Sequence, residues 1–372
     1  MNKPSLRIVQ TESSCGWGNQ EARILIESLG MQSRGHAVEL VCCAESVIAN
    51  RAREFGIPVT TLPIRRRNFQ GLASTRLWLS KRDVDIVHTH SSSDSWLMSL
   101  ACRALIKRPK IVRTRHVGAA AKSKATSKWI YTKGADFVLT TSHTIRNSLM
   151  SSYGLTQRCS MAIPTGIDLN HFKPGDQTFA REFLGLPIER KLVGLITDSQ
   201  SLTDPEFLCE AIASLDRDDF DLLILGSGLD RTAIENCVSS FDLKARTYLI
   251  ESSDNIVPYL NALNIAVLPA CRKVAEQQLL RQIMSCGVPI ISTLDDQSEP
   301  ILTDKKTGRM VFQEDTGSLA NLISELLDDA NQCKRLGANA RQTACEQFSI
   351  KTMLDQIEEV YLQLSEPRRI AA

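Results

Sequence analysis

Apolar and polar positions change their spacing several times along this chain. Short runs of branched or apolar residues predict buried strands at residues 6–10, 38–41, 58–62, 85–88, 110–113 and 136–140. About 15 to 30 residues separate these runs, and residues 20–34 have the spacing of an amphipathic helix. Such an alternation of strand and helix is typical of a parallel, doubly wound α/β sheet.

The pattern returns in the second half of the chain. Strands are predicted at residues 192–196, 221–225, 265–268 and 288–291, and helices at 206–215, 229–237 and 351–364. Turn residues are densest between the halves, at residues 163–175. We therefore expect two Rossmann-like domains, residues 1–168 and 169–350, and a last segment, residues 351–372, forming a helix packed on the first domain. The expected site lies in the cleft between the domains, beyond the carboxyl ends of the strands.

The two halves carry opposite charge. Residues 1–173 hold 25 Lys and Arg against 11 Asp and Glu, a net charge of +14, which leaves −12 for the remainder. A basic domain favours an anionic partner, such as a membrane surface or a phospholipid-linked substrate. Nucleic acid is also anionic, but the chain has no recognised reader motif, so we expect no nucleic acid partner. The residues expected at the membrane or the acceptor are Arg65, Arg66, Arg67, Trp78, Lys122, Lys124, Lys128 and Trp129.

Eleven cysteines are scattered along the chain without a C-x-x-C pair. This distribution disfavours a disulfide framework and a structural zinc, and it is typical of a reducing cytosol. No apolar run approaches the ~20 residues that cross a bilayer, and the first residues lack the apolar part of a signal peptide. We expect a cytoplasmic protein that associates peripherally with the inner face of the cytoplasmic membrane.

Two glycine loops are candidates for binding an anion. The first predicted strand is followed by Gly16, Gly18 and Asn19 at the start of a helix, where backbone N–H groups and the helix dipole attract phosphate. This loop is neither a Walker loop nor a complete G-x-G-x-x-G, so a plain tight turn is equally consistent. A later strand is followed by Gly226 and Gly228, which again suits a phosphate or a nucleotide.

Histidines follow two strands of the first half. His116 comes just after the strand predicted at residues 110–113, where a doubly wound fold presents catalytic side chains. A surface histidine at a strand end is the plainer interpretation of the same position. His88 and His90 flank the end of another strand, but no carboxylate or cysteine has suitable spacing nearby, so we expect no metal site.

Together these motifs resemble the group-1, or family 4, retaining glycosyltransferases. The resemblance covers almost the whole chain, through residues 16–21, 85–90, 114–116, 163–174, 226–229 and 284–291. It implies the GT-B architecture of two Rossmann-like domains. It also implies a nucleotide-sugar donor held mainly by the C-terminal domain, an acceptor held by the N-terminal domain, transfer with retention, and no metal ion or other cofactor.

The resemblance also assigns residues to the site. His116 would lie beside the transferred sugar as the catalytic residue. The residues implied in donor binding are Gly16, Gly18, Asn19, Gly226, Gly228, Gln282 and Glu299. The basic first domain suits a glycolipid or polysaccharide acceptor, as in enzymes that build lipopolysaccharide or other surface glycans.

Three positions depart from the family pattern. Asp198 and Thr203 stand where members carry an Arg and a Lys that neutralise the diphosphate, and Val274 stands where members carry the first of two glutamates. A shifted loop in which Arg272 or Lys273 supplies the positive charge is a second interpretation. The chain is therefore an active glycosyltransferase with a rearranged donor site, or a donor-degenerate GT-B pseudoenzyme that serves as a binding or scaffold subunit.

Overall fold

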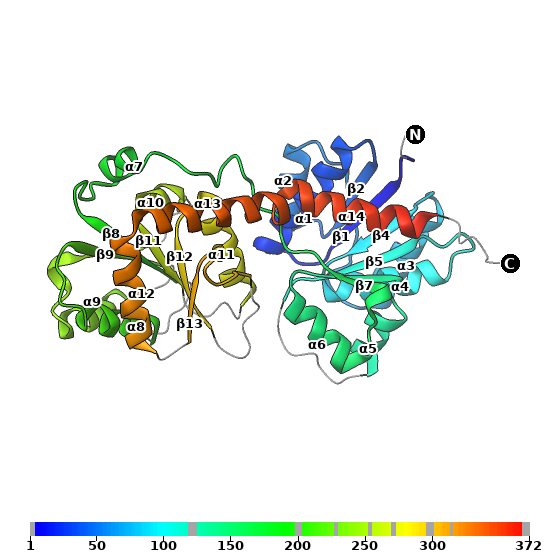
Figure 1. Ribbon diagram of the computed structural model, residues 1–372. Helices are drawn as coiled ribbons and strands as arrows, with labels where there is room; N and C mark the ends of the chain where they lie inside the picture. The colour runs from blue at the N-terminus through cyan, green and yellow to red at the C-terminus, as the bar shows by residue number, and fades with distance from the viewer. Residues whose placement is uncertain are drawn as a thin grey trace. The chain divides into compact units, whose positions relative to one another are not determined.

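The computed structural model describes residues 4–117, 125–197, 203–226, 230–251, 255–268, 273–294, 301–312 and 315–366. The chain forms two compact units. Figure 1 shows the ribbon, with the colour running from blue at the N-terminus to red at the C-terminus. The first unit comprises Met1–Thr165 together with Ile350–Ala372, and the second comprises Gly166–Ser349. Each unit contains one parallel sheet covered by helices, so the α/β class with two Rossmann-like domains is confirmed.

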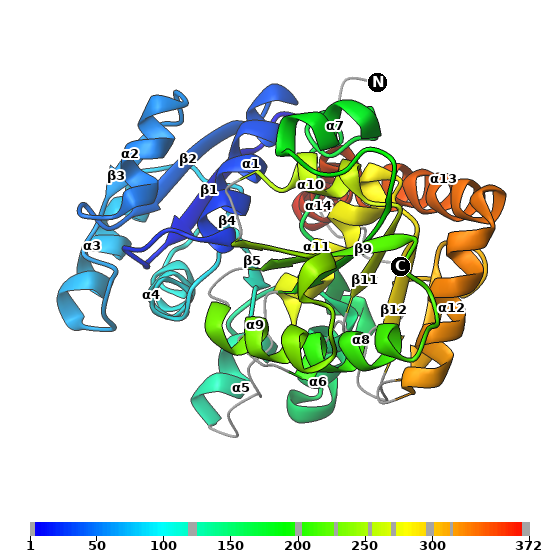
Figure 2. The same cartoon turned by 90° about the vertical axis from the view of Figure 1, so that its left-hand side faces the viewer.

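The first sheet has seven parallel strands in the order β3-β2-β1-β4-β5-β6-β7. Their bounds are β1 Arg7–Glu12, β2 Ala37–Cys42, β3 Val59–Thr61, β4 Ile86–Thr89, β5 Lys110–Arg115, β6 Phe137–Thr140 and β7 Ser160–Ala162. The strand order reverses between β1 and β4, as the left part of Figure 2 shows. Ligands of doubly wound sheets bind beyond the carboxyl ends of the strands at such a reversal.

The helices of the first unit include the last helix of the chain. They are α1 Asn19–Ser33, α2 Val47–Glu54, α3 Phe69–Ser80, α4 Ser92–Arg103, α5 Ala125–Thr132, α6 His143–Tyr153 and α14 Ile350–Ser365. The apolar positions of α14 recur with the period of one helix face. Met353, Ile357 and Tyr361 are buried in one cluster with Ile8 and Ile86 of the first sheet. The end of the chain is therefore part of the first unit's core.

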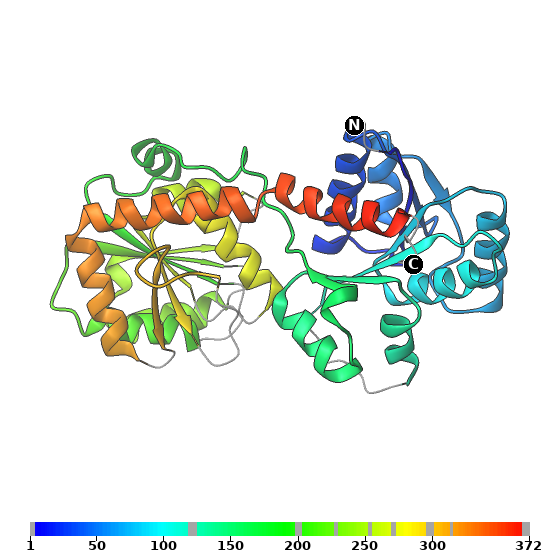
Figure 3. The ribbon, with the colours of Figure 1, turned by 45° about the vertical axis from the view of Figure 1, so that its right-hand side comes forward.

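The second sheet has six parallel strands in the order β10-β9-β8-β11-β12-β13. Their bounds are β8 Lys191–Thr197, β9 Phe220–Gly226, β10 Thr247–Glu251, β11 Ile265–Leu268, β12 Ile290–Leu294 and β13 Arg309–Phe312. The helices of this unit are α7 Gln177–Leu184, α8 Thr203–Ala213, α9 Arg231–Ser240, α10 Val257–Ala262, α11 Val274–Cys286, α12 Thr316–Asp328 and α13 Ala330–Gln347. One apolar cluster contains residues of α8, α9 and α12, and another contains residues of α10, α11 and α13. Figure 3 shows helices on both faces of this sheet.

Three strands, β7, β10 and β13, were not predicted from the sequence. Each lies at the edge of its sheet. An edge strand packs against one neighbour only, so its apolar pattern is weaker, and all five residues of β10 are at least partly exposed. Among the described residues, no helix is long and apolar enough to span a membrane. The ten cysteines in the described ranges are free thiols.

Candidate functional site

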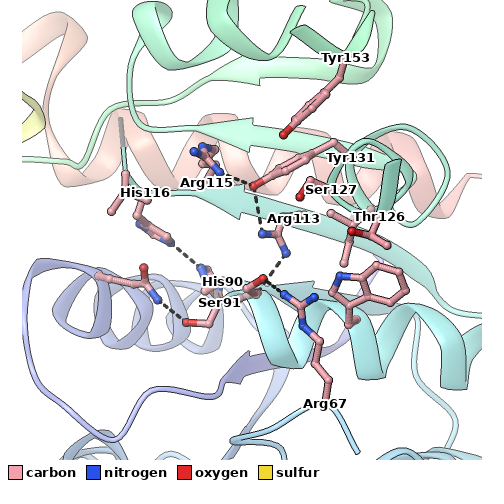
Figure 4. A pocket seen from close by; sticks show the side chains of 15 residues that line it. Arg67, His90, Ser91, Arg113, Arg115, His116, Thr126, Ser127, Tyr131 and Tyr153 are labelled. Carbon is pink, nitrogen blue, oxygen red and sulfur yellow. Dashed lines mark hydrogen bonds between the residues drawn. The ribbon is translucent and has the colours of Figure 1, made fainter. Parts of the chain in front are cut away.

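The carboxyl ends of β4 and β5 bring two histidines together. His90 and His116 each follow directly after a strand, and parallel strands end at the same edge of a sheet. His90 Nδ1 therefore lies 2.9 Å from His116 Nε2. A pocket of about 480 Å³ opens here within the first unit, as Figure 4 shows. Its polar lining includes Gln20, Arg67, His90, Ser91, Arg113, Arg115, His116 and Tyr131.

The histidines of this edge are buried. The exposed fractions of His88, His90 and His116 are 0%, 3% and 9%. Burial, with a smaller contribution from the Arg23 cation, lowers the pKa of His88 to about 3. Burial also holds the pKa of His90 and that of His116 well below the ordinary range of an imidazole. All three rings are therefore neutral at pH 7.

Glu27 supplies the carboxylate that the sequence analysis did not find near His88 and His90. These three residues each offer one atom within 4.8 Å of the others. However, Glu27 Oε1 accepts a hydrogen bond of 2.6 Å from Arg23 Nε, and both ring nitrogens of each histidine are hydrogen bonded. A divalent cation would displace these bonds and would lie beside the buried Arg23 guanidinium. This set of donors does not fit a metal ion.

Two arginines of β5 share one phenol. Arg113 donates to Tyr131 Oη at 3.1 Å and to the carbonyl oxygen of Ser91 at 3.0 Å, and Arg115 donates to Tyr131 Oη at 2.9 Å. Burial opposes ionisation of Tyr131, but the two guanidinium groups outweigh it and lower the pKa of the phenol. Arg113 Nε is buried and has no hydrogen-bond partner among the described residues. The wall of the pocket is therefore cationic.

Arg67 adds a third guanidinium to this pocket. Its side chain donates to Ser92 Oγ and lies over the ring of Trp96, with 5.4 Å between the guanidinium carbon and the ring centroid. Burial, together with repulsion from Arg113, lowers the pKa of Arg67. Trp96 also lines the pocket and stacks on Trp129, with ring centroids 4.9 Å apart.

The predicted glycine loop is held in place by Glu12, the last residue of β1. Glu12 Oε1 accepts a hydrogen bond of 2.6 Å from the backbone N–H of Ser14 and another from Ser91 Oγ, and Oε2 accepts from Gln20 Nε2. Gly16, Gly18 and Asn19 lie on the exposed side of this loop. Gly18 precedes α1 and supplies no side-chain cap, so the first turn of the helix can accept an anion as its cap.

The residues predicted to contact the membrane or the acceptor differ in their exposure. Arg65, Arg66 and Lys128 are exposed, and Trp129 is half-buried with its indole stacked on that of Trp96. The prediction for Trp78 is wrong, because only 8% of this residue is exposed and its ring packs in a core cluster with Leu79 and Met98. Trp78 lies on the side of α3 that faces the sheet. The basic residues around it in the sequence gave no indication of this orientation. Lys122 and Lys124 lie outside the described residues.

In the second unit, the predicted donor residues lie on β9 and α11. Gly226 is the buried last residue of β9, whereas Gly228 and Glu299 lie outside the described residues. Gln282 lies on α11 and is half-buried. Each keeps its role in donor binding as a prediction.

The departing positions begin two helices. Val274 is the first residue of α11, and Thr203 is the first residue of α8, with its side chain outside the described part. Asp198 also lies outside the described residues. Glu276 does not substitute for the missing glutamate, because its carboxylate accepts the backbone N–H of Lys273 at 2.8 Å and pairs with the Lys273 ammonium at 3.1 Å. It therefore serves as part of the helix cap.

Sequence reasoning missed the residues that support the pocket. The sequence pattern predicts β1 and α14 as buried core elements. The polar atoms of Gln10 and Glu12 on β1, and of Tyr361 on α14, therefore gave no indication of a site. Arg113 and Arg115 alternate with Thr114 along β5, and two arginines within a buried strand were the one available clue.

Comparison with known proteins identifies the family. Residues 21–171 match the family described as Glycosyltransferase Family 4, and residues 176–343 match the family described as Glycosyl transferases group 1. The chain belongs to the group-1 glycosyltransferases with the GT-B fold, which are sugar transferases.

Individual relatives agree with this assignment. N-acetyl-alpha-D-glucosaminyl L-malate synthase from Bacillus anthracis is 23% identical over 300 residues, which cover 78% of each chain. A glycosyltransferase from Rickettsia africae ESF-5 has a similar structure, with a TM-score of 0.81 and 18% identity over 97% of this chain and 98% of that one. Anabaena Alr3699/HepE, solved with UDP and glucose, gives a TM-score of 0.73 and 16% identity over 95% of this chain and 99% of that one. At these identities the two structures show the shared fold.

Proposed function

We propose that this protein transfers a sugar, with retention and without a metal ion, from a nucleotide-sugar to an acceptor bound in the first unit's pocket. The observation that carries the proposal is the pocket itself, at the carboxyl ends of β4 and β5, where His116 and the cationic wall meet. Backbone N–H groups at Gly16 and Gly18 would lie beside the donor diphosphate. His116 would hydrogen bond the transferred sugar.

The acceptor carries a phosphate or a carboxylate in this proposal. Arg67 and Arg113 donate to uncharged partners, namely Ser92 Oγ, the Ser91 carbonyl oxygen and Tyr131 Oη, and Arg113 Nε has no partner among the described residues. A planar guanidinium fits both kinds of anion with paired hydrogen bonds. The name of one relative includes L-malate, a dicarboxylic acid. The glycolipid or polysaccharide acceptor expected from the sequence supplies the same chemistry through a lipid phosphate or an acidic sugar.

The residues divide the work in this reaction. Arg67 and Arg113 would hold the anionic group, and the part of the Trp96 ring that lines the pocket would pack against the acceptor's apolar surface. Such positioning fixes the attacking hydroxyl relative to the transferred sugar. Transfer then requires stabilisation of the leaving diphosphate, which the backbone N–H groups and the dipole of α1 would provide.

A second candidate function follows from α11. Val274 begins this helix where the family carries a glutamate, and Glu276 is committed to the helix cap. A unit that cannot hold the donor would leave an acceptor-binding scaffold subunit in surface-glycan synthesis. Calorimetric titration with a panel of nucleotide-sugars separates the two functions, because the transferase binds at least one donor, weakly where this is a common UDP- or GDP-sugar, whereas the scaffold binds none.

A transfer assay tests the acceptor chemistry. We expect transfer to acceptors that carry a phosphate or a carboxylate, and little transfer to neutral analogues of the same size. Arg67→Ala should raise the KM for the anionic acceptor by about 10- to 100-fold, the effect of one charged hydrogen bond. Arg53→Ala, which removes an exposed arginine of α2, is the matched control. Equal transfer to charged and neutral acceptors would refute the anionic site.

The source of the anion is decided by presenting it in two forms. The same phosphate-bearing glycan is offered free in solution and as a glycolipid in vesicles. Preference for the vesicle form supports a membrane acceptor and peripheral attachment to the membrane, and preference for the free form supports a soluble acceptor.

A further inference from the structure

A line of hydrogen bonds leads from the pocket into the core of the first unit. Its first half joins the two histidines at the strand ends to β1. His116 Nε2 lies 2.9 Å from His90 Nδ1, and His90 Nε2 lies 2.7 Å from Gln10 Oε1. Gln10 is completely buried, so its amide has no access to water.

The second half of the line passes through the last helix of the chain. Gln10 Nε2 donates to Tyr361 Oη of α14 at 3.2 Å, and Tyr361 Oη lies 2.6 Å from His88 Nδ1. His88 Nε2 lies 2.7 Å from Thr114 Oγ1 on β5. Tyr361, His88 and Thr114 are all completely buried.

A neutral imidazole has one N–H and one lone pair. A histidine that donates a hydrogen bond on one side must therefore accept one on the other, so one direction fixes the direction of all the bonds in the line. The carbonyl oxygen of Gln10 faces His90 and can only accept, which places the His90 proton on Nε2. His90 Nδ1 is then a lone pair, so the proton of His116 lies on Nε2. The nitrogen that His116 retains for a ligand is Nδ1, an acceptor.

The opposite direction would also satisfy the line. If the Gln10 amide were inverted, every proton would move to the other side and His116 would carry its proton on Nδ1. Glu27 favours that direction, because its Oε2, which has no hydrogen-bond partner among the described residues, lies 3.5 Å from His88 Nδ1 and attracts a proton there. The orientation of the Gln10 amide opposes this attraction, because its Nε2 donates to Tyr361 Oη and its Oε1 faces His90 Nε2. The hydroxyl groups of Tyr361 and Thr114 can donate or accept, so they satisfy either direction.

We propose that Gln10 and Tyr361 are positioning residues that fix the tautomer of His116. They hold His116 as the Nε2–H form, so that it accepts a hydrogen bond from a sugar hydroxyl instead of donating one. The consequence for the sugar rests on the proposed function, but the tautomer is a property of the free protein. The last helix of the chain thereby controls the chemistry of the residue that follows β5.

Nitrogen-15 NMR of the full chain, labelled at histidine, tests the proposal without any donor. The chain has six histidines, and two-bond proton correlations show which ring nitrogen of each carries the proton. We expect the Nε2–H form for His90 and for His116, unchanged across neutral pH. Finding His116 in the Nδ1–H form would overturn the proposal.

Two variants remove the hydroxyl groups on either side of His88. Tyr361→Phe and Thr114→Val each leave a buried N–H of the present direction without an acceptor, which costs more than an unpaired lone pair. Both should therefore shift His116 toward the Nδ1–H form. If both variants leave the spectra of His90 and His116 unchanged, the line does not set the tautomer.

His36 reports whether α14 remains docked in these variants. Its Nδ1 accepts the backbone N–H of Leu6 at 3.1 Å, and its Nε2 lies 3.2 Å from Glu358 of α14. A tautomer shift at His116 with an unchanged His36 signal supports the proposal. Because Thr114 lies on β5, Thr114→Val keeps the test valid even if Tyr361→Phe displaces the helix. Tyr248→Phe on β10 of the second unit is the matched control and should change neither histidine.

Discussion

Glu12 holds the glycine loop in place, although burying its carboxylate costs free energy. Its carboxylate accepts three hydrogen bonds that fix Ser14, Ser91 and Gln20 around the loop. However, the residue is completely buried near Asp94, which is also buried. Burial, reinforced by repulsion from Asp94, raises the pKa of Glu12 to about 7. The anchor of the loop therefore changes its charge near physiological pH.

This pKa predicts how the stability of the first unit depends on pH. Because the folded pKa of Glu12 lies above the unfolded value, folded protein binds more protons between about pH 4.5 and 7. The contribution of Glu12 to stability is therefore largest below pH 4.5 and is lost as the pH rises through 7. Glu12→Gln has no titrating group here, so its stability relative to the natural protein should rise by about 1–3 kcal/mol from pH 5 to pH 8.

Urea unfolding followed by tryptophan fluorescence measures this difference. All four tryptophans belong to the first unit, so the signal reports that unit alone. Glu54→Gln at the exposed end of α2 is the control and should show the pH dependence of the natural protein. Parallel pH profiles for Glu12→Gln and the natural protein would contradict the raised pKa.

The helix α3 presents a face that fits an anionic membrane. Phe69 and Leu77 are 85% and 60% exposed, although large apolar side chains favour the interior. Arg76 is exposed on the same helix, and Arg65 and Arg66 are exposed just before it. Exposed apolar side chains among arginines suit the boundary between headgroups and acyl chains.

We predict that this face of α3 binds anionic vesicles without inserting a helix through them. Phe69→Ser with Leu77→Ser should lower sedimentation with acidic vesicles severalfold, and raised salt should lower the binding of the natural protein. Each basic residue near the surface contributes about 1 kcal/mol. The control is Trp78→Phe, a buried neighbour on α3 that should bind as the natural protein does. Salt-independent binding to neutral and acidic vesicles alike would contradict the prediction.

The packing of α14 on α1 depends on Gly30. A Cβ atom at Gly30 would lie 2.3 Å from Leu354 Cδ1, so an alanine here requires the Leu354 side chain to move. Leu354 is 6% exposed and belongs to the same core cluster as Tyr361. This contact therefore helps to hold α14 against the first unit.

A double-mutant cycle tests this contact. Gly30→Ala should destabilise the first unit by about 1–3 kcal/mol through overpacking, and Leu354→Ala by about 2–5 kcal/mol through a cavity. The double variant should be at least about 1 kcal/mol more stable than the sum of these losses, because the new methyl group occupies the space that Leu354 leaves. Additive losses in urea unfolding would show that the two side chains do not share this space.

Across the whole molecule, the sequence predicted the strands and helices far better than it predicted which side chains contact one another. Buried central strands such as β1 and β8 have continuous apolar patterns, so the two sheets and their helices could be predicted. His116 could be placed at a strand end for the same reason. The partners of that residue could not, because Gln10, Tyr361 and Glu27 are far apart in sequence and meet only through the topology of the fold. The prediction for Trp78 was wrong because the position of a residue around the helix axis, rather than the composition of its neighbours in sequence, decides which side chain is buried.

The opposite charges of the two halves make donor binding the decisive property of the molecule. In the proposed function the acidic second half would hold a diphosphate, and the resemblance places Asp198 and Thr203 where the family carries two cations. A carboxylate about 5 Å from a diphosphate charge is repelled by about 3 kcal/mol at an effective dielectric constant near 20. Backbone N–H groups and a helix dipole return only about 0.3–2 kcal/mol.

We therefore predict weak or absent binding of common UDP- and GDP-sugars in calorimetric titration. Asp198→Arg with Thr203→Lys should restore measurable affinity for a nucleoside diphosphate, because it reverses the charge at position 198 and adds a cation at position 203. The matched control is Asp216→Arg with Ser214→Lys, which adds the same cations at exposed positions before β9, at the amino end of that strand. Micromolar binding by the natural protein would overturn the prediction and favour a fully competent transferase. Restoration by the control pair would show that net charge, rather than the charges at positions 198 and 203, limits binding.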